Sequence, residues 1–200
     1  MEYRKLKVEG AVEFVPRLFP DARGQFAALY QESVFAEAAG RPFFPVAQTN
    51  CSVSQRGALR GIHFTATPPG SMKYVYCAHG SFIDMVVDLR VGSPTFGRWD
   101  AIHIDSRAPR AVFLPAGLGH AFLSLEDGTA VTYLCSEEYA AENEFGISAL
   151  DPALGLPIPD DIEIILSERD RGAPSMAEAR AQGLFPSYAD CLKTERADGS

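Results

Sequence analysis

Eight short segments rich in valine, isoleucine, phenylalanine and tyrosine follow one another through the middle of the sequence, and no convincing helix interrupts them. They span residues 46–54, 58–64, 73–79, 81–90, 96–104, 111–115, 121–125 and 130–137. Residues typical of turns separate them at 68–70, 92–94, 116–117 and 127–128. Short strands at nearly regular spacing indicate an antiparallel sandwich or barrel, and we expect a jelly roll.

The segments before and after these strands predict the extent of the domain and its flanking elements. We expect one domain over residues 1–200, with its core at about 12–175 and a C-terminal helix and tail at 175–200. Residues 12–19 alternate well enough for an edge strand, because Pro16 would keep it away from the centre of a sheet. The other predicted elements are a turn at 20–24 with Arg23 at its exposed tip, a strand at 25–30, a helix at 32–40 ended by Gly40, a short helix at 175–182 and a frayed polar tail from Lys193.

Composition excludes several classes of protein. The sequence is 46% hydrophobic and 22% charged, as in soluble globular chains, and its net charge of −8 argues against a nucleic-acid-binding surface. It has no apolar run of bilayer length and none after the basic residues near Met1, so we expect no membrane span, no signal peptide and a cytoplasmic location. Its four widely separated cysteines predict buried, reduced thiols.

Alternation along the predicted strands brings chemically active residues to common faces. Lys73 shares a face with Val75, and Tyr133 shares one with Val131, so Lys73 and Tyr133 could both line a barrel interior. Lys73 could equally be a solvated residue at a strand end.

His63 and Arg60 lie three positions apart, which in a regular strand would place them on opposite faces. A β-bulge is accommodated most easily at Gly61, and it would bring both to one face. Taken alone, a single histidine in a strand is more often a packed or surface side chain than a catalytic one.

The sequence Leu-Pro-Ala-Gly-Leu-Gly-His at 114–120 resembles the second histidine motif of the cupins, a superfamily of jelly-roll barrels. Metal-binding cupins carry a His-x-His pair in their first motif, whereas only His63 stands at that place here, and His79 and His103 have no ligand-like spacing. We therefore expect no metal site. Removing a proton next to a ketone needs a base, a cation at the developing enolate and an acid, and His63, Lys73 and Tyr133 are the right residue types.

Ordered motifs between about residues 17 and 174 carry a resemblance to a known family. They are Asp21-x-Arg23-Gly24, Gln-Thr-Asn at 48–50, Leu-Arg-Gly-Ile-His at 59–63, Val-Asp-Leu-Arg at 87–90, Gly-Ser-Pro-Thr-Phe-Gly at 92–97, Pro115-x-Gly117-x-x-His120-x-Phe122, Asp-Pro-Ala-Leu-Gly at 151–155, and Leu-Ser-x-x-Asp at 166–170 followed by Ala173-Pro174. The sequence thus resembles the dTDP-4-dehydrorhamnose 3,5-epimerases. The stretches 68–73, 114–122 and 159–163 are most similar to the branch that serves deoxysugars of natural products such as antibiotics.

The resemblance implies a mainly β, cupin-type jelly-roll barrel with short flanking helices near both termini. It also implies an isomerase that inverts C3, C5 or both of a dTDP-linked 4-keto-6-deoxyhexose without a metal or an organic cofactor. In that scheme His63 is the base, Asp170 the carboxylate paired with it, Lys73 the cation at the enolate, and Tyr133 the acid on the opposite face. The implied substrate-binding residues are Arg23, Gln48, Asn50, Arg60, His120, Glu144 and Arg169. A homodimer in which an N-terminal strand crosses to the partner is implied as well.

Four positions depart from the family pattern. Ala28 stands where a glutamate is usual, Thr49 where an aspartate is usual, Tyr76 where an arginine is common and Arg169 where a lysine is common. These departures affect the positions that bind the nucleotide and orient the sugar, and not those that carry the acid–base chemistry. Two alternatives from other classes stay open: a cupin that binds nucleotide sugars without turnover, and a metal-dependent cupin enzyme.

Overall fold

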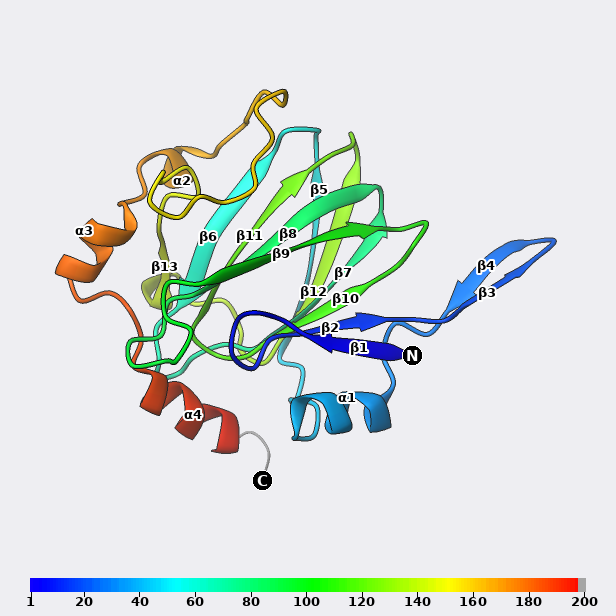
Figure 1. Cartoon of the computed structure of the whole chain (residues 1–200), viewed down its shortest axis with the longest axis horizontal. Coiled ribbons are helices and arrows are strands. Elements are labelled where there is room, and N and C mark those ends of the chain that lie inside the picture. Colours follow the sequence, from blue (N-terminus) through cyan, green and yellow to red (C-terminus); the bar gives the residue numbers. More distant parts are fainter. Residues whose placement is uncertain (198–200) are drawn as a thin grey trace.

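Two antiparallel sheets packed face to face form the body of the computed structural model, which describes residues 1–197 (Figure 1). The larger sheet has the spatial order β1 (Glu2–Lys5), β2 (Val12–Val15), β10 (Ala111–Leu114), β7 (Lys73–His79), β12 (Thr129–Cys135) and β5 (Gln48–Ser54). The smaller sheet has the order β13 (Glu144–Gly146), β6 (Leu59–Thr65), β11 (Leu118–Ser124), β8 (Ser81–Asp88) and β9 (Trp99–Asp105).

The remaining elements flank this sandwich. A separate hairpin, β3 (Leu18–Asp21) and β4 (Gly24–Ala27), extends away from the body (Figure 1). The helices are α1 (Glu32–Ala39), η1 (Ala141–Asn143), α2 (Glu168–Arg171), α3 (Met176–Ala181) and α4 (Tyr188–Ala197). No helix within residues 1–197 is both long enough and apolar enough to cross a membrane.

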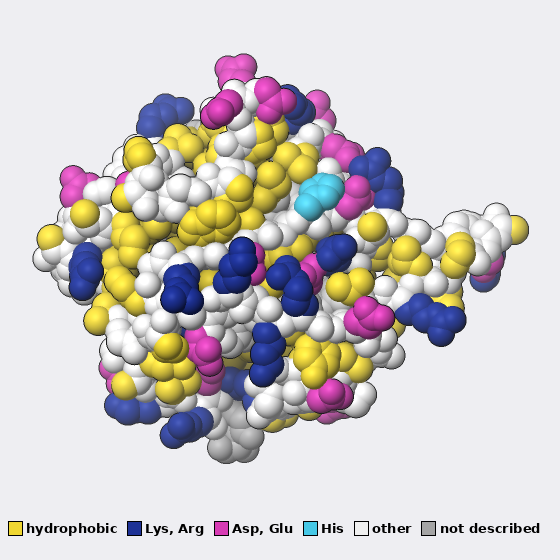
Figure 2. All heavy atoms as spheres, in the orientation of Figure 1, with side chains coloured by type: hydrophobic (Ala, Val, Ile, Leu, Met, Phe, Trp, Pro, Cys, Tyr) yellow, Lys and Arg dark blue, Asp and Glu magenta, His cyan; other side chains and the backbone are white. Residues whose placement is uncertain are grey.

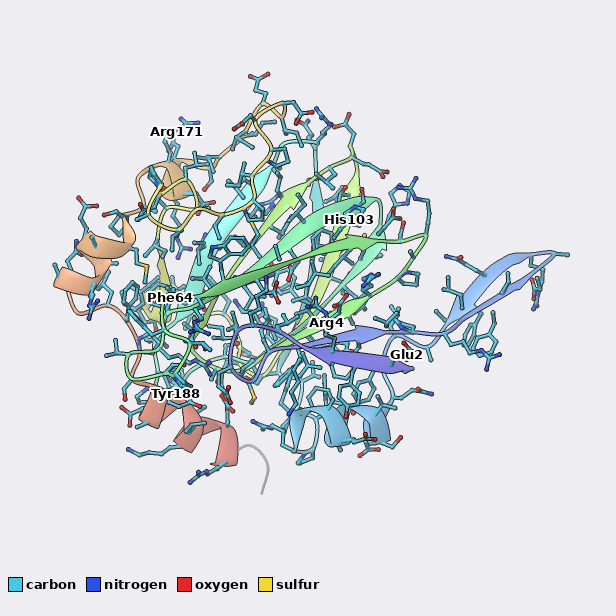
Figure 3. The ribbon with its side chains drawn as sticks, viewed as in Figure 1. Glu2, Arg4, Phe64, His103, Arg171 and Tyr188 are labelled. Atoms are coloured by element: carbon cyan, nitrogen blue, oxygen red, sulfur yellow. The ribbon has the colours of Figure 1, made fainter. Side chains whose placement is uncertain are left out.

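The core lies between the sheets, where side chains fill the space between the layers (Figure 3). Val75 and Val131 of the larger sheet share one buried cluster with Phe82, Val86 and Phe122 of the smaller sheet. Each such side chain stabilises the fold by about 1.5–3 kcal/mol through removal of its apolar surface from water.

Parts of both sheets are also covered on their outer faces, and there the strands are apolar on both sides. Helix α1 contributes Phe35 to a cluster on the larger sheet that includes Phe14 and Tyr74. On the smaller sheet Phe64 packs against Phe145 and Phe185, which follow it far along the chain, with ring centroids 5.9 and 5.8 Å away.

The predicted mainly β jelly-roll fold is confirmed. Each of the eight predicted central segments overlaps a strand, and the segment 73–79 has the observed bounds. The helix predicted at 32–40 is α1, and Gly40 ends it in the left-handed conformation, with φ of 68° and its N–H bonded to the Ala36 carbonyl. The short helix predicted at 175–182 is α3, which begins with a capping box at Ser175.

Three predictions were wrong. Residues 12–19 do not form one edge strand: β2 ends before Pro16 and lies between β10 and β1, because β1 supplies the outer partner. The polar tail predicted from Lys193 is helical as far as residue 197, as part of α4, and its last residues, 198–200, lie outside the described part of the chain. Cys51 is exposed because its side chain points outward from the edge strand β5.

The bulge predicted at Gly61 is present. His63 lies opposite His120 and Arg60 opposite Phe122, so two residues of β6 face a single residue of β11. Phe122 belongs to the cluster between the sheets, and His120 shares its face of β11. The bulge therefore turns both Arg60 and His63 toward the inside of the sandwich.

We expect the substitution Gly61→Ala to destabilise the protein by at least about 3 kcal/mol, because strain and a steric clash combine. Gly61 has φ of +107°, and an added Cβ would meet the His120 carbonyl oxygen and lie 2.8 Å from Ala121 Cα. Gly128 is the matched control: its φ is +76°, but an added Cβ would meet nothing within 4 Å. Urea denaturation should show a loss of only about 1 kcal/mol for Gly128→Ala. Equal losses for the two variants would contradict the close packing at the bulge.

Candidate active site

A cavity opens between the two sheets, and both sheets line it. It has two adjoining lobes, which share His63, Lys73, Tyr133 and Arg169. The larger lobe has a volume of about 610 Å³, within the range of small-molecule sites. Its walls carry Arg60, Lys73 and Arg169, so the cavity is locally basic although the whole chain carries a net charge of −8.

His63 on β6 forms a close pair with Asp170 on α2. The distance from His63 Nε2 to Asp170 Oδ1 is 2.6 Å, and the aspartate side chain is only 6% exposed, against 30% for the histidine. A carboxylate at Nε2 accepts the proton of that nitrogen, and the second ring nitrogen, Nδ1, is then the one able to take up a proton. The pair has the geometry of a histidine base oriented by a carboxylate.

Local structure holds Asp170 ionised. Burial opposes its charge, but hydrogen bonding and the charge of His63, together with hydrogen bonds to Ser167 and the Gly61 backbone, lower the pKa of the carboxyl below its usual value. Ser167 is the N-cap of α2 and accepts a hydrogen bond from the Asp170 N–H at 3.0 Å. The bulge and the helix cap therefore meet at the same carboxylate.

Lys73 and Tyr133 approach the cavity from the larger sheet. Tyr133 on β12 lies opposite Val75 on β7, and Lys73 lies opposite Cys135, so the two side chains belong to the same inner face. Burial raises the pKa of the Tyr133 hydroxyl, with a further contribution from Cys135. Tyr133 thus stays protonated at neutral pH and can act as a proton donor.

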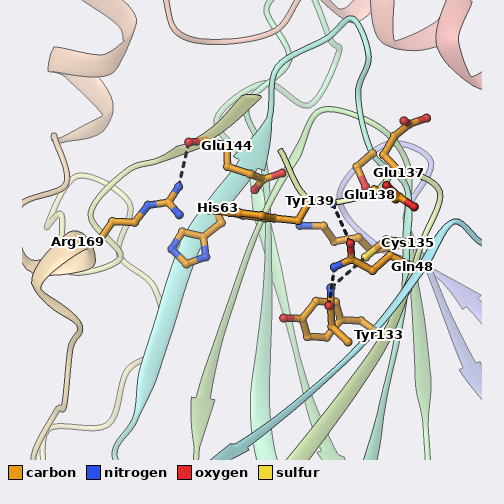
Figure 4. A pocket seen from close by; sticks show the side chains of 12 residues that line it. Gln48, His63, Tyr133, Cys135, Glu137, Glu138, Tyr139, Glu144 and Arg169 are labelled. Carbon is orange, nitrogen blue, oxygen red and sulfur yellow. Dashed lines mark hydrogen bonds between the residues drawn. The ribbon is translucent and has the colours of Figure 1, made fainter. Parts of the chain in front are cut away.

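Two residues on β5 line the smaller lobe and are held in place by hydrogen bonds; Gln48 is labelled in Figure 4. Gln48 Nε2 donates to Asn50 Oδ1 at 2.7 Å, and the Tyr139 N–H donates to Gln48 Oε1 at 2.8 Å. Asn50 Nδ2 in turn donates to Cys135 Sγ at 3.7 Å. These contacts fix the amide groups that face the cavity.

The polar residues on the other wall are also oriented. Arg60 Nε donates to Ser54 Oγ at 3.1 Å, and Arg169 donates to the Glu144 carbonyl oxygen at 2.9 Å. Glu144 accepts a hydrogen bond from the Thr65 hydroxyl at 2.6 Å. His120 on β11 completes this wall.

The structure brings together ten of the eleven site residues that the sequence predicted. They are Gln48, Asn50, Arg60, His63, Lys73, His120, Tyr133, Glu144, Arg169 and Asp170. Arg23 is the exception: it lies at the tip of the β3–β4 hairpin, its side chain is 89% exposed, and it pairs with Asp21 at 2.6 Å. Within the single chain nothing carries Arg23 to the cavity.

Sequence reasoning missed several residues at the site. Asp84 lies 2.5 Å from His120 and is fully buried. Its signal was an acidic residue at an inward position of the otherwise apolar run 82–87. Ser71, Cys135, Glu137, Glu138 and Tyr139 also line the smaller lobe. Most of these follow or precede strands in connecting segments that have no periodicity to predict their direction.

Within residues 1–197 no group of three or more histidine, cysteine, aspartate or glutamate side chains is placed to hold a metal ion. The expectation of a metal-free site stays a prediction. A jelly-roll sandwich with a histidine–carboxylate pair facing a lysine and a tyrosine across one cavity is the arrangement expected of a cupin-type acid–base enzyme.

Comparison with known proteins agrees with this class. The family model described as dTDP-4-dehydrorhamnose 3,5-epimerase matches residues 5–178. A dTDP-4-dehydrorhamnose 3,5-epimerase of Mycolicibacterium smegmatis is 48% identical over 96% of this chain and 94% of the relative. A dTDP-4-dehydro-6-deoxyglucose 3-epimerase of Streptomyces bikiniensis is 50% identical over 92% of this chain and 93% of the relative. The chain belongs to the dTDP-4-dehydrorhamnose 3,5-epimerase family of isomerases.

Solved structures show the same relationship. A 3′-monoepimerase from Streptomyces bikiniensis, in complex with dTDP-quinovose, superposes with a TM-score of 0.91 at 48% identity, covering 96% of this chain and 97% of that one. An epimerase from Mycobacterium tuberculosis superposes with a TM-score of 0.93 at 43% identity, covering 99% of this chain and all of that one (100%). The cupin-type fold expected from the sequence is therefore confirmed.

Proposed function

We propose that this chain inverts the configuration at C3, at C5 or at both carbons of a dTDP-linked 4-keto-6-deoxyhexose. The observation that carries the proposal is the placement of His63, paired with Asp170 of α2, on one sheet and of Lys73 and Tyr133 on the sheet facing it. A base and an acid on opposite walls of one cavity can act on the two faces of a single carbon, which is the requirement for inversion.

The proposed reaction is a proton transfer through an enolate. His63 Nδ1 takes the proton from the carbon next to the C4 ketone, and the electron pair of the broken C–H bond moves onto the C4 oxygen. The Lys73 ammonium stabilises that oxygen, because a cation held in place beside developing negative charge lowers its free energy. Tyr133 then donates its hydroxyl proton to the opposite face of the carbon, and solvent removes the proton from His63 and restores that of Tyr133.

In the proposed complex the basic side chains of the cavity bind the nucleotide half of the substrate. Arginine presents planar paired donors that suit phosphate oxygens, and Arg60 and Arg169 line the larger lobe. Solved relatives are complexes with dTDP and with dTDP-quinovose, which supports the same nucleotide here.

Three of the four departures from the family pattern lie outside the cavity of the single chain, whereas the fourth, Arg169, lines it and keeps the positive charge. Thr49 is exposed on the outward face of β5, between Gln48 and Asn50, which point inward. Tyr76 packs with the aromatic cluster beneath α1, and Ala28 lies between β4 and α1. The acid–base chemistry is therefore compatible with all three. A cytoplasmic location stays a prediction.

A homodimer is the second part of the proposal. The β3–β4 hairpin projects from the body, which it contacts through hydrogen bonds from Gln25 to the Ser106 and Arg107 carbonyls, and it carries the exposed side chains Leu18, Phe19 and Phe26, the last of them 67% exposed (Figure 2). A hairpin with so much apolar surface is stabilised by a partner. Docking on a second copy would also bring Arg23 to a cavity that its own chain does not let it reach.

We expect His63→Ala to retain dTDP binding within about threefold and to lower solvent-deuterium exchange into the substrate by about 10²–10⁴-fold, the usual contribution of a general base. Titration calorimetry measures the binding, and NMR in deuterated buffer with dTDP-4-keto-6-deoxyglucose measures the exchange. The control is His103→Ala, because His103 is an exposed histidine on β9 outside the cavity. Exchange at the wild-type rate in His63→Ala would overturn the assignment of the base, and a wild type without exchange would favour a binding protein.

We expect Phe26→Asp to convert a dimer into a monomer in sedimentation velocity experiments, because it places a charge in the proposed apolar contact. Leu150→Asp is the control, since Leu150 is 46% exposed on a loop far from the hairpin and should leave the dimer intact. A wild-type protein that sediments as a monomer at micromolar concentration would contradict the proposal.

A further inference from the structure

A second histidine–carboxylate pair lies beside the first, deeper in the sandwich. His120 Nε2 is 2.5 Å from Asp84 Oδ1, and the two side chains are 10% and 0% exposed. The other carboxylate oxygen, Asp84 Oδ2, is buried and has no hydrogen-bond partner among the described residues. The contact with His120 is thus what compensates the burial of this acid.

A carboxylate in such a place is stable as an anion only when a cation lies against it, because transfer of an unpaired charge out of water is costly. The other charged side chains that line this lobe of the cavity are mostly cations: Arg60, Lys73 and Arg169, with Asp170 as the acid. These cations oppose a further positive charge on His120. Asp84 is the group that offsets them.

The register of the strands fixes where this charge would act. His120 on β11 lies directly opposite His63 on β6, and such cross-strand neighbours have Cβ atoms about 5 Å apart on the same face. Asp84 on β8 reaches His120 from the other side, since His120 is paired with Val86, two residues along. The His120 ring therefore stands next to the proposed base.

We propose that Asp84 is a positioning residue that holds His120 as an imidazolium, so that His120 Nδ1–H donates to the enolate oxygen which forms at C4. The proposal rests on the proposed function and adds a second cation to the site, on the wall that carries His63. Lys73 approaches the same oxygen from the facing sheet. Asp84 and His120 exchange no proton with the substrate: both N–H bonds of His120 persist through the reaction, and only the charge on the oxygen changes.

In this proposal the neighbouring residues His63 and His120 are in opposite protonation states before the reaction. His63 must be a free base before the reaction, and its 30% exposed ring can return its proton to solvent. His120 must remain charged, and its ring is enclosed against a carboxylate that is closed to water. The difference in solvent access of the two carboxylate-linked rings supports this division.

The test compares Asp84→Asn with Asp88→Asn. Asparagine keeps the size and an acceptor oxygen at position 84 but removes the charge. We expect kcat of Asp84→Asn with dTDP-4-keto-6-deoxyglucose to fall about 10- to 100-fold, somewhat less than the loss of a whole oxyanion donor, while KM stays within about threefold.

Asp88 is equally buried on the same strand, but it is bonded to Arg90, Ser93 and Thr95 outside the cavity. Asp88→Asn should lower the melting temperature and leave kcat unchanged.

A second measurement needs no substrate. Nitrogen-15 NMR of the unliganded wild type at pH 7 should show both ring nitrogens of His120 protonated, and Asp84→Asn should show a neutral ring. A neutral His120 in the wild type would overturn the proposal even if Asp84→Asn failed to fold. So would a kcat of Asp84→Asn within twofold of the wild-type value. Should the wild type not epimerise this substrate at all, the proposed function fails, and the NMR spectrum alone then decides whether Asp84 holds the charge.

Discussion

The site depends on the bulge that sets two residues of β6 against one residue of β11. Without it, Arg60 and His63 would point to opposite faces of the sheet, and one of them would enter the apolar layer on the outer face. The bulge needs Gly61, which has positive φ and lies too close to the β11 backbone for a side chain. It also turns the Gly61 backbone toward Asp170, which helps to keep that carboxylate ionised beside His63.

The sandwich supplies the second requirement, which is access to both faces of one carbon. The smaller sheet carries His63 and the larger sheet carries Lys73 and Tyr133, so in the proposed mechanism the reaction takes place in the cavity between the layers. The same burial that stabilises the fold raises the pKa of Tyr133 and keeps its proton available. Burial between the sheets therefore contributes both to the stability of the fold and to the protonated state of Tyr133.

Much of this could be predicted from local sequence. The alternation of side chains along a strand has a period of two residues, so Lys73 and Tyr133 could be named as candidates for an inner face, although Lys73 could equally have been a solvated strand end. The spacing of Arg60 and His63 predicted a bulge if both were to share one face. Asp170 could be named only through family resemblance, because it is 107 positions from His63. The C-terminal segment that carries it is brought to His63 by packing against the smaller sheet, which no local pattern predicts. Asp84 was missed because its partner is set by the register of β8 against β11, which no local pattern encodes. The edge position expected for residues 12–19 failed for a similar reason, since the pairing of β1 is a matter of topology.

In the proposed mechanism, proton abstraction and proton return come from opposite walls of the cavity, so the two steps can be separated. The most direct test is the Tyr133→Phe variant with dTDP-4-keto-6-deoxyglucose in deuterated buffer, followed by proton NMR of the sugar. We expect that deuterium still enters next to the ketone, because His63 is intact, while the yield of the inverted sugar falls sharply. Loss of exchange together with inversion would contradict it, because Tyr133 would then be needed for the abstraction itself.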